Sequence, residues 1–279
     1  MAYRRILTVQ DISCLGQCSA TVALPILSAC GHETCILPTA VLSTHTGGFG
    51  PVEKRDLTGD FSGILAHWKR ENLDFDAVYT GYLGSKEQIA WALDVFSSMV
   101  APGGVRIVDP AMADHGKLYK GFDDSYVEQM KVLCASADVI IPNVTEGCML
   151  TGIPYQVDAD SEFVKELLGK LSKLCPRVVL TGVGEKPGQT GVAAHWAGEL
   201  WQYSHPKSEK SFHGTGDMFA AAFVGAWQQG KAPEEAVKIA ADFTALAIEK
   251  TCRNPAHWYG VKFETALPEL IQMVLDGNK

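Results

Sequence analysis

The chain has 279 residues, of which 47% are hydrophobic and 20% charged, so it can build a large core and is not extensively disordered. Its formal net charge of −8 argues against nucleic acid or an anionic membrane surface as the main partner. No apolar stretch suits a signal peptide or a membrane span, so we expect a soluble, cytoplasmic protein. The eight cysteines form no CxxC pair, and we expect reduced thiols rather than disulfides or a zinc site.

Strand and helix signals alternate from the start of the chain. Residues 4–10 predict a short buried strand, and about 17–30 a helix. Residues 34–41 predict an extended segment, in which Pro38 indicates an edge position or a bulge because proline cannot donate to a ladder. The segment STHTGGFG that follows is a loop by composition.

The alternation continues beyond this loop. Further strands are predicted over 76–82, 105–111, 137–143 and 177–183. Helices are predicted over about 57–72, 85–99, 123–136, 145–151, 160–174, 215–229, 233–250 and 263–275. Residues 190–205 alternate apolar and polar side chains around Ala197-Gly198, which predicts a hairpin.

This order of elements predicts a three-layer αβα sandwich with a central, mostly parallel sheet that helices cover on both faces. No linker rich in proline, glycine or serine interrupts it, so we expect a single domain over residues 1–279. The polar segment 112–122 is long for a loop in a compact domain, and such loops are often functional covers.

Polar or glycine residues follow the apolar runs of five predicted strands. In open α/β sheets, ligands bind at the carboxyl ends of the strands. The five positions are Gln10-Asp11, Thr80-Gly81-Tyr82, Asp109-Pro110, Asn143 and Thr181-Gly182. Each alone fits a plain turn equally well, but five on one rim predict a ligand site there.

Residues 212–217 (FHGTGD) lead directly into the helical pattern MFAAAFVGAW. Gly214 and Gly216 let the backbone approach a ligand closely, and the free N–H groups at the start of the helix make an oxyanion or phosphate cradle. Asp217 lies in the predicted first turn, where the alternative interpretation is an ordinary helix-start carboxylate. No Walker A motif occurs, and no GxGxxG follows the first strand.

The segment GTGDMFAAAFVGAW resembles the anion-hole helix of ribokinase-like kinases, and AVKIAADFTALAI is similar to the helix that follows it there. Within that superfamily the pyridoxal kinase family fits best. Its characteristic segments are matched here, in order, by VQDISCLGQCSATVALPILSACG, LSTHTGGF, TGYLGS, DPAMAD and IIPNVTEGCMLTG. The likeness spans about residues 6–250 and implies a ribokinase-like fold and ATP-dependent phosphorylation of the hydroxymethyl group of a B6 vitamer.

The resemblance also implies roles for the matching residues in phosphoryl transfer. Asp217 would be the general base, and the Gly214, Thr215 and Gly216 amides would stabilise the transferring phosphoryl group. Asp109 and Glu146 would hold Mg²⁺, with K⁺ as a further candidate ion. The ATP-binding residues would be Asp109, Asp114, Tyr119, Asn143, Glu146, Thr181, Gly182 and Phe212. A turn-forming role for Asp109 and a core position for Phe212 are the alternatives.

The substrate ring would meet Asp11, His45, Thr46 and Tyr82, of which His45 is also open to a structural interpretation. The family has serine at position 11, and we hypothesise that Asp11 favours a protonated ring nitrogen and so shifts the preference among pyridoxal, pyridoxine and pyridoxamine. The flap 112–122 would exclude water from the nucleotide. A homodimer is expected by similarity alone.

Two other functions remain open from the sequence. A hydroxymethylpyrimidine kinase shares the same chemistry, although its usual glycine-rich opening is absent and His213 replaces its cysteine before GTGD. A noncatalytic homologue that binds nucleotide or vitamer is the alternative outside the enzymes, and the retained base, glycine turn and carboxylates speak against it.

Overall fold

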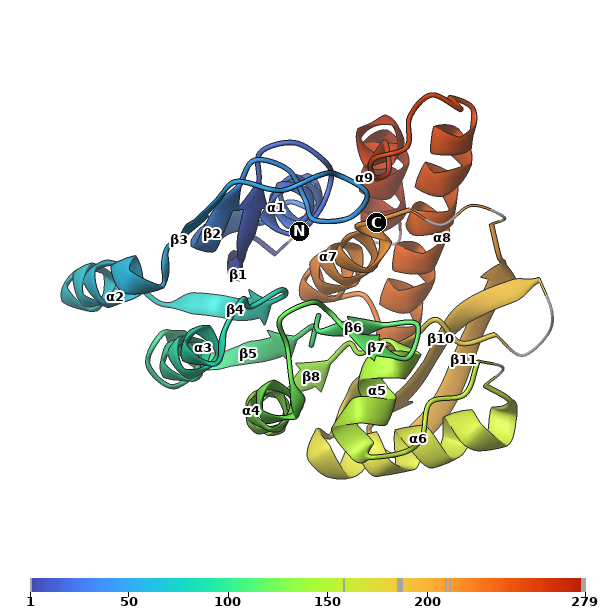
Figure 1. The fold of residues 1–279 in the computed structure, drawn as a ribbon, viewed down its shortest axis with the longest axis horizontal. Coiled ribbons are helices and arrows are strands. Elements are labelled where there is room, and N and C mark those ends of the chain that lie inside the picture. The colour runs from blue at the N-terminus through green and yellow to red at the C-terminus, as the bar shows by residue number, and fades with distance from the viewer. Residues whose placement is uncertain (1, 158, 185–187, 209, 211, 277–279) are drawn as a thin grey trace. The chain divides into compact units, whose positions relative to one another are not determined.

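The computed structural model describes residues 2–157, 159–184, 188–208, 210 and 212–276. Its chain forms two compact units (Figure 1). The terminal unit comprises Met1–Ala77 and Ser208–Lys279, and the central unit comprises Val78–Lys207. The boundary falls inside strand β4 (Phe75–Thr80). A single domain over residues 1–279 stays a prediction.

Among the described residues, the main sheet has nine strands in the order β11-β10-β9-β8-β5-β4-β1-β2-β3, and β6 and β7 form a second sheet of two strands. The pairs β1–β2, β5–β8 and β8–β9 are parallel, whereas β2–β3, β9–β10 and β10–β11 are antiparallel. Helices flank this mostly parallel sheet, as the alternation of elements predicts. The predicted fold class is confirmed.

In the terminal unit, two parallel strands carry a helical layer. The strands are β1 (Arg5–Ser13) and β2 (Glu33–Leu42), with the short β3 (Lys54–Asp56) beside β2. The helices are α1 (Ala20–Ala29), α2 (Phe61–Arg70), α7 (Thr215–Gln228), α8 (Pro233–Cys252) and α9 (Leu267–Leu275), with 3-10 turns at Thr58–Asp60 and Phe263–Ala266.

Helix α7 is the buried centre of the terminal unit and packs against both α1 and α8 (Figure 1). Ten of its residues, Met218–Ala226 and Gln228, are buried, which explains the unbroken apolar pattern of its sequence. Small side chains permit the close approach. A Cβ on Gly225 would lie 2.5 Å from Cys30 Sγ of the loop after α1.

In the central unit the strands are β4, β5 (Val100–Val108), β8 (Val139–Ile140), β9 (Val178–Thr181), β10 (Gln189–Trp196) and β11 (Glu199–Pro206), with β6 (Ala113–Asp114) and β7 (Lys117–Leu118) apart from them. The helices are α3 (Lys86–Ser98), α4 (Asp124–Ala135), α5 (Val144–Thr151) and α6 (Ser161–Leu174). Helix α4 packs on α3 and α5, and α5 packs on α6.

All four of these helices begin at a side-chain cap. Ser85, Asp123, Asn143 and Asp160 each accept a hydrogen bond from the backbone amide three residues later. Such a cap satisfies one of the amides that a helix start leaves without a partner. These four side chains therefore explain where each helix of this unit begins.

Two local predictions are confirmed. Ala197 and Gly198 connect β10 and β11 with φ of 53° and 87°, the left-handed pair that a two-residue hairpin needs. Pro38 lies opposite Gln10 where the β1–β2 register shifts, so it marks a bulge. Among the described residues no helix is long and apolar enough to cross a membrane.

Candidate active site

In the terminal unit, Gly214 positions the start of α7. Its backbone is left-handed, with φ of 81°, and a Cβ there would overlap the carbonyl oxygen of Gln17. Only glycine allows this turn to press against the loop that follows β1. In contrast to the helices of the central unit, no described side chain caps α7. The amides of its first turn are therefore the kind of site that binds an anion.

Asp217 lies in that first turn and is half-buried. Its Oδ2 accepts a hydrogen bond of 2.9 Å from the backbone amide of Ser19. Ser19 precedes α1 in a rare backbone conformation, φ 53°, and bridges to Ile12 of β1. The loop between β1 and α1 thus brings its own backbone to the predicted base.

A second carboxylate belongs to the same cluster. Asp11, on β1, is 4% exposed, and its Oδ2 accepts a hydrogen bond of 3.3 Å from the Ser13 hydroxyl. Burial raises the pKa of Asp11, although hydrogen bonds from the Ser19 and Ser13 side chains act against this. Ser19 therefore serves both acids, through its amide for Asp217 and its side chain for Asp11.

The electrostatics suit Asp217 to proton transfer. Burial raises its pKa to about 6, the negative charge of Asp11 acts in the same direction, and the Ser19 amide acts in the opposite one. A carboxylate with this pKa is mostly ionised at neutral pH yet more basic than an exposed aspartate. Such perturbed acids mark functional sites more often than ordinary surface positions.

The loop with His45 completes the cluster in the terminal unit. His45 is 4% exposed, its Nδ1 accepts from the Gly47 amide at 3.1 Å, and its Nε2 has no partner among the described residues. Burial lowers the pKa of His45, and the nearby His213 adds to this. A neutral ring with a free nitrogen is a ready hydrogen-bonding group. Thr46 beside it is exposed.

Aromatic rings hold this loop against the segment before α9. Phe49 lies 5.0 Å from His45, 4.8 Å from Trp258 and 5.9 Å from Tyr259 between ring centroids. A Cβ on Gly47 would lie 2.5 Å from the His213 ring. Phe49, which directly follows Gly47 and Gly48 in the chain, thus links this loop to the segment before α9.

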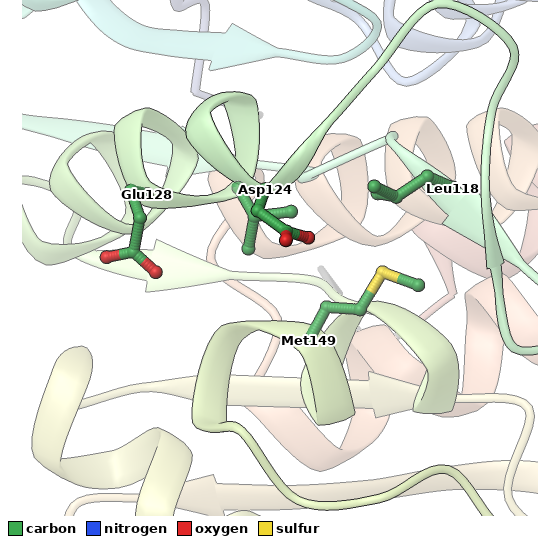
Figure 2. A pocket seen from close by; sticks show the side chains of 5 residues that line it. Leu118, Asp124, Glu128 and Met149 are labelled. Atoms are coloured by element: carbon green, nitrogen blue, oxygen red, sulfur yellow. The ribbon is translucent and has the colours of Figure 1, made fainter.

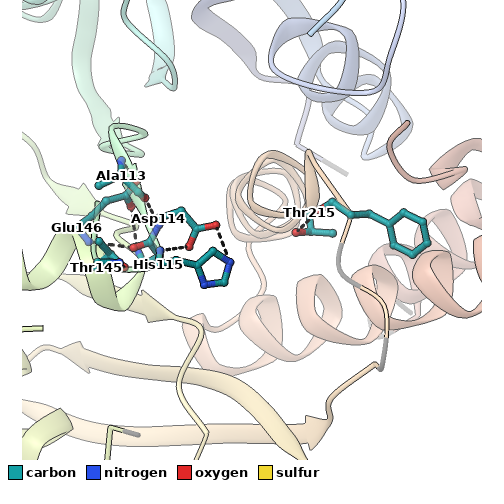
Figure 3. Close-up of polar contacts among 9 residues, drawn as sticks. Ala113, Asp114, His115, Thr145, Glu146 and Thr215 are labelled. Atoms are coloured by element: carbon teal, nitrogen blue, oxygen red, sulfur yellow. Dashed lines mark hydrogen bonds and ion pairs between the residues drawn. The ribbon is translucent and has the colours of Figure 1, made fainter. Parts of the chain in front are cut away.

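In the central unit, Glu146 fastens the segment after β5 (Figure 3). Its Oε1 accepts hydrogen bonds from the amides of Met112 (3.1 Å) and Ala113 (3.4 Å), and its Oε2 accepts one from the Asn143 amide (2.8 Å). The Asn143 side chain makes two hydrogen bonds. It accepts one from the Glu146 amide and donates one to the Ala113 carbonyl. Burial raises the pKa of Glu146, whereas the hydrogen bonds from the three amides lower it and favour the carboxylate.

The predicted flap contains a small hairpin rather than a plain loop. Its turn, His115-Gly116, has φ of 49° and 75°, and β6 and β7 pair on either side of it. The Gly116 amide donates to the Thr145 hydroxyl at 3.0 Å, so the turn is tied to α5 (Figure 3). Asp114, on this hairpin, and Tyr119, directly after it, are both exposed.

Aromatic stacking fixes the far end of the flap. Phe122 stacks on Tyr126 of α4 with 3.8 Å between ring centroids, and Tyr82 lies 5.6 Å from Phe122. The Tyr126 hydroxyl donates to the Leu83 carbonyl at 2.6 Å. The candidate substrate residue Tyr82 therefore lies in the same aromatic cluster as the flap.

The remaining predicted nucleotide residues of the central unit lie at strand ends, as expected. Asp109 follows β5 and is 7% exposed. Thr181 ends β9 and bridges to Asn143, while Gly182 follows with φ of 77°, and a Cβ on Gly182 would meet no atom within 4 Å. In the terminal unit, the carbonyl oxygen of Phe212 accepts a hydrogen bond of 3.3 Å from the Thr215 hydroxyl.

A surface pocket of about 180 Å³ in the central unit is a separate feature (Figure 2). It is lined by Leu118, Asp124, Val127, Glu128 and Met149. Pockets that enclose small molecules usually measure about 300–1,000 Å³. This hollow is too small for a nucleotide, and none of the predicted site residues lines it.

The donor sets decide how well Mg²⁺ would fit. Both acceptor directions of Glu146 Oε1 are used by amides, and Oε2 keeps one. Glu146 therefore suits contact through a metal-bound water better than direct coordination. Among the described residues, no three His, Cys, Asp or Glu side chains gather into a metal site, so bound Mg²⁺ would depend on one or two carboxylates together with phosphate oxygens and water.

The sequence indicates Asp217, Asp11 and Glu146 but not the groups that orient them. Ser19, Ser13 and Thr145 carry the hydrogen bonds to these acids or to the flap. A hydroxyl residue just before a helix is a readable signal for Ser19, whereas the contact of Thr145 with Gly116 spans 29 residues and leaves no local trace.

A family model and a curated relative match much of the chain. The family model described as phosphomethylpyrimidine kinase matches residues 28–261. Pyridoxal kinase PdxY of Histophilus somni (strain 2336) is 29% identical over 181 residues, which are 63% of this chain and 63% of that relative. That alignment thus spans less than two thirds of the relative.

Two solved structures are similar over almost their full length. Pyridoxal kinase from Lactobacillus plantarum is 33% identical with a TM-score of 0.89, covering 99% of this chain and 98% of that one. A structure from Bacteroides thetaiotaomicron VPI-5482, named as a phosphomethylpyrimidine kinase and solved in a form with pyridoxal, is 37% identical with a TM-score of 0.90, covering 96% of each chain.

Proposed function

The chain belongs to the pyridoxal kinase family of the ribokinase-like superfamily, and we propose that it uses ATP to phosphorylate the 5′-hydroxymethyl group of a B6 vitamer, in the salvage of pyridoxal 5′-phosphate. The observation that carries this proposal is the half-buried Asp217 in the first turn of the uncapped helix α7. A base and an anion-binding helix start on adjacent residues are the two parts that phosphoryl transfer to an alcohol requires.

In this reaction Asp217 takes the proton of the hydroxymethyl group while the freed oxygen attacks the γ-phosphorus of ATP. The bond from that phosphorus to the β–γ bridging oxygen breaks, and ADP leaves with the electron pair. The amides of Gly214, Thr215 and Gly216 stabilise the negative charge on the transferring group. With a pKa of about 6, Asp217 is ionised at neutral pH and ready to accept the proton.

The central unit supplies the residues that we assign to the nucleotide. Thr181 ends β9, Asp109, Asn143 and Gly182 follow strands, and Asp114 and Tyr119 belong to the flap. Bound Mg²⁺ would neutralise phosphate charge, held by Asp109 directly and by Glu146 through water. We assign Phe212, in the terminal unit, to the adenine.

We assign the substrate ring to Asp11, His45, Thr46 and Tyr82. The relative from Bacteroides thetaiotaomicron was solved with pyridoxal, which supports a B6 vitamer as the acceptor. A cytoplasmic location, a homodimer and a K⁺ requirement are further proposals that rest on the family resemblance. Light scattering in solution and assays with K⁺ replaced by Na⁺ test the last two.

A hydroxymethylpyrimidine kinase is the competing function, since the matching family model is described as phosphomethylpyrimidine kinase, which also acts on a pyrimidine. One coupled assay separates the two. ADP release is measured with Mg²⁺-ATP and, in turn, pyridoxal, pyridoxine, pyridoxamine and 4-amino-5-hydroxymethyl-2-methylpyrimidine, and the phosphorylated product is identified by mass spectrometry.

We expect the highest kcat/KM with a B6 vitamer. A higher value with the pyrimidine would overturn the vitamer assignment in favour of the competing enzyme. Binding of a vitamer with no turnover above the ATPase background would instead identify a noncatalytic homologue.

A further inference from the structure

We propose that Asp11 is a specificity-determining residue that makes the substrate site select acceptors bearing an ammonium group. This inference rests on the proposed function, because it concerns which member of the substrate class the same site prefers. It goes beyond that function by assigning the choice to one carboxylate.

The position of Asp11 is set by its neighbours in the terminal unit. Its carboxylate is 4% exposed and accepts a hydrogen bond of 3.3 Å from the Ser13 hydroxyl. Ser19, which contributes a side-chain hydrogen bond to Asp11, donates its amide to Asp217 at 2.9 Å. Asp11 and Asp217, the residue that we assign to proton transfer, therefore share Ser19 as a hydrogen-bonding partner.

This second carboxylate makes no ion pair with any of the described residues. Lys54 is the charged group that acts on Asp11 and lowers its pKa, while Asp11 itself raises the pKa of Asp217 and of the Cys18 thiol. The Cys18 thiol is neutral, because burial and both carboxylates raise its pKa. Asp11 and Asp217 thus both lie beside Ser19, where little positive charge offsets theirs.

A buried carboxylate without a cation is costly, since burial removes the water that would otherwise stabilise its charge. A positively charged ligand group removes that cost on binding and forms a charge-assisted hydrogen bond, whereas a neutral group does neither. The serine expected at this position from the family resemblance would supply a hydroxyl and no charge. Pyridoxamine, which carries an ammonium group, should gain most from Asp11.

The test compares kcat/KM for pyridoxamine and pyridoxal between the wild-type protein and Asp11→Asn and Asp11→Ser. Asparagine preserves the shape of the side chain and serine restores the family residue. We expect kcat/KM for pyridoxamine to fall about 10- to 100-fold, the effect of losing a charge-assisted hydrogen bond, and that for pyridoxal to change less than about threefold. Asp60→Asn, an exposed carboxylate before α2, is the matched control and should leave both values unchanged.

A second readout is independent of substrate choice. Removing the charge of Asp11 should move the acid limb of the pH profile of kcat/KM to lower pH, because Asp11 disfavours ionisation of Asp217. A purely structural role would lower kcat/KM for every vitamer alike without moving the limb.

Equal losses for both vitamers, or an unchanged ratio in both variants, would overturn the inference while leaving the proposed function intact. If the wild-type protein phosphorylates no vitamer, the proposed function itself fails. The two failures are therefore distinguishable in one set of assays.

Discussion

At the N-terminus of α7, backbone geometry and acid chemistry depend on each other. Gly214 can turn left-handed against Gln17 because it has no side chain, and this places the first turn of α7 beside the loop that holds Ser19. The Ser19 amide then anchors Asp217 in a fixed orientation. A general base needs such positioning before its pKa matters.

Gly214→Ala should destabilise the protein by more than about 1 kcal/mol, since a left-handed non-glycine residue alone costs about that much. The overlap of the new Cβ with the Gln17 carbonyl adds to the cost. The melting temperature in the absence of ligands measures this. Gly216→Ala is the matched control, because a Cβ there meets no atom within 4 Å, and it should melt at or above the wild-type temperature. Equal melting temperatures for the two variants would contradict the role of Gly214.

The pH dependence of kcat/KM should show an acid limb near pH 6. The base must be unprotonated, and burial raises the pKa of Asp217 to about 6, so activity is lost as the pH falls through this value rather than below pH 4. Because the vitamers also titrate, the limb should be measured with two of them and fall at the same pH for both. A limb below about pH 5 would show that Asp217 is not the titrating group.

Among the elements, the β6–β7 hairpin in the predicted flap is held at its start by one carboxylate. Glu146 caps its own helix by bonding the Asn143 amide, and the same side chain holds the amides of Met112 and Ala113 where the hairpin begins. The proposed nucleotide residues on α5 and the flap therefore share one hydrogen-bonding network.

Glu146→Gln should loosen this hairpin. A glutamine has one acceptor oxygen and one donor nitrogen, so it cannot serve the amides on both sides as the carboxylate does. Trypsin cleavage after Lys117 and Lys120, followed by mass spectrometry, should be about tenfold faster than in the wild-type protein, as expected for a lost hydrogen bond to a charged group. Glu162→Gln on the exposed start of α6 is the control. Unchanged cleavage in Glu146→Gln would show that other contacts hold the hairpin.

The elements also show what a sequence can predict. Strands and helices with strong apolar patterns, such as α7 and the β10–β11 hairpin, lie where they are predicted. Strand β3 is not predicted because its residues Lys54–Asp56 are exposed and charged, and only pairing with β2 makes them a strand. Strands β6 and β7 have two residues each, too few for any periodic signal.

The site is predictable where it is local in sequence. The GTGD turn and the residues at strand ends follow from general rules about helix starts and parallel sheets. The double use of Ser19 and the reach of Glu146 to residues 112–113 depend on contacts across 198 and 33–34 residues. Such contacts leave no pattern in a single sequence. For Asn143 and Glu146, the family resemblance indicates a role in nucleotide and ion binding but does not indicate that the two residues cap α5.

The proposed function requires a chain with a net charge of −8 to bind a highly anionic nucleotide. Uncapped helix amides and glycine turns supply local positive potential without basic side chains, so the overall charge is no obstacle. The terminal unit contains the proposed base, and the central unit contains most of the residues that we assign to the nucleotide.

The variant Asp217→Asn shows whether Asp217 removes the substrate proton. The steady-state kcat with Mg²⁺-ATP and the preferred vitamer is measured beside the rise in melting temperature that each ligand causes, which reports binding. We predict that kcat falls about 100- to 10,000-fold while both ligands still raise the melting temperature as in the wild-type protein. A loss of kcat smaller than about tenfold, with binding intact, would show that another group is the base.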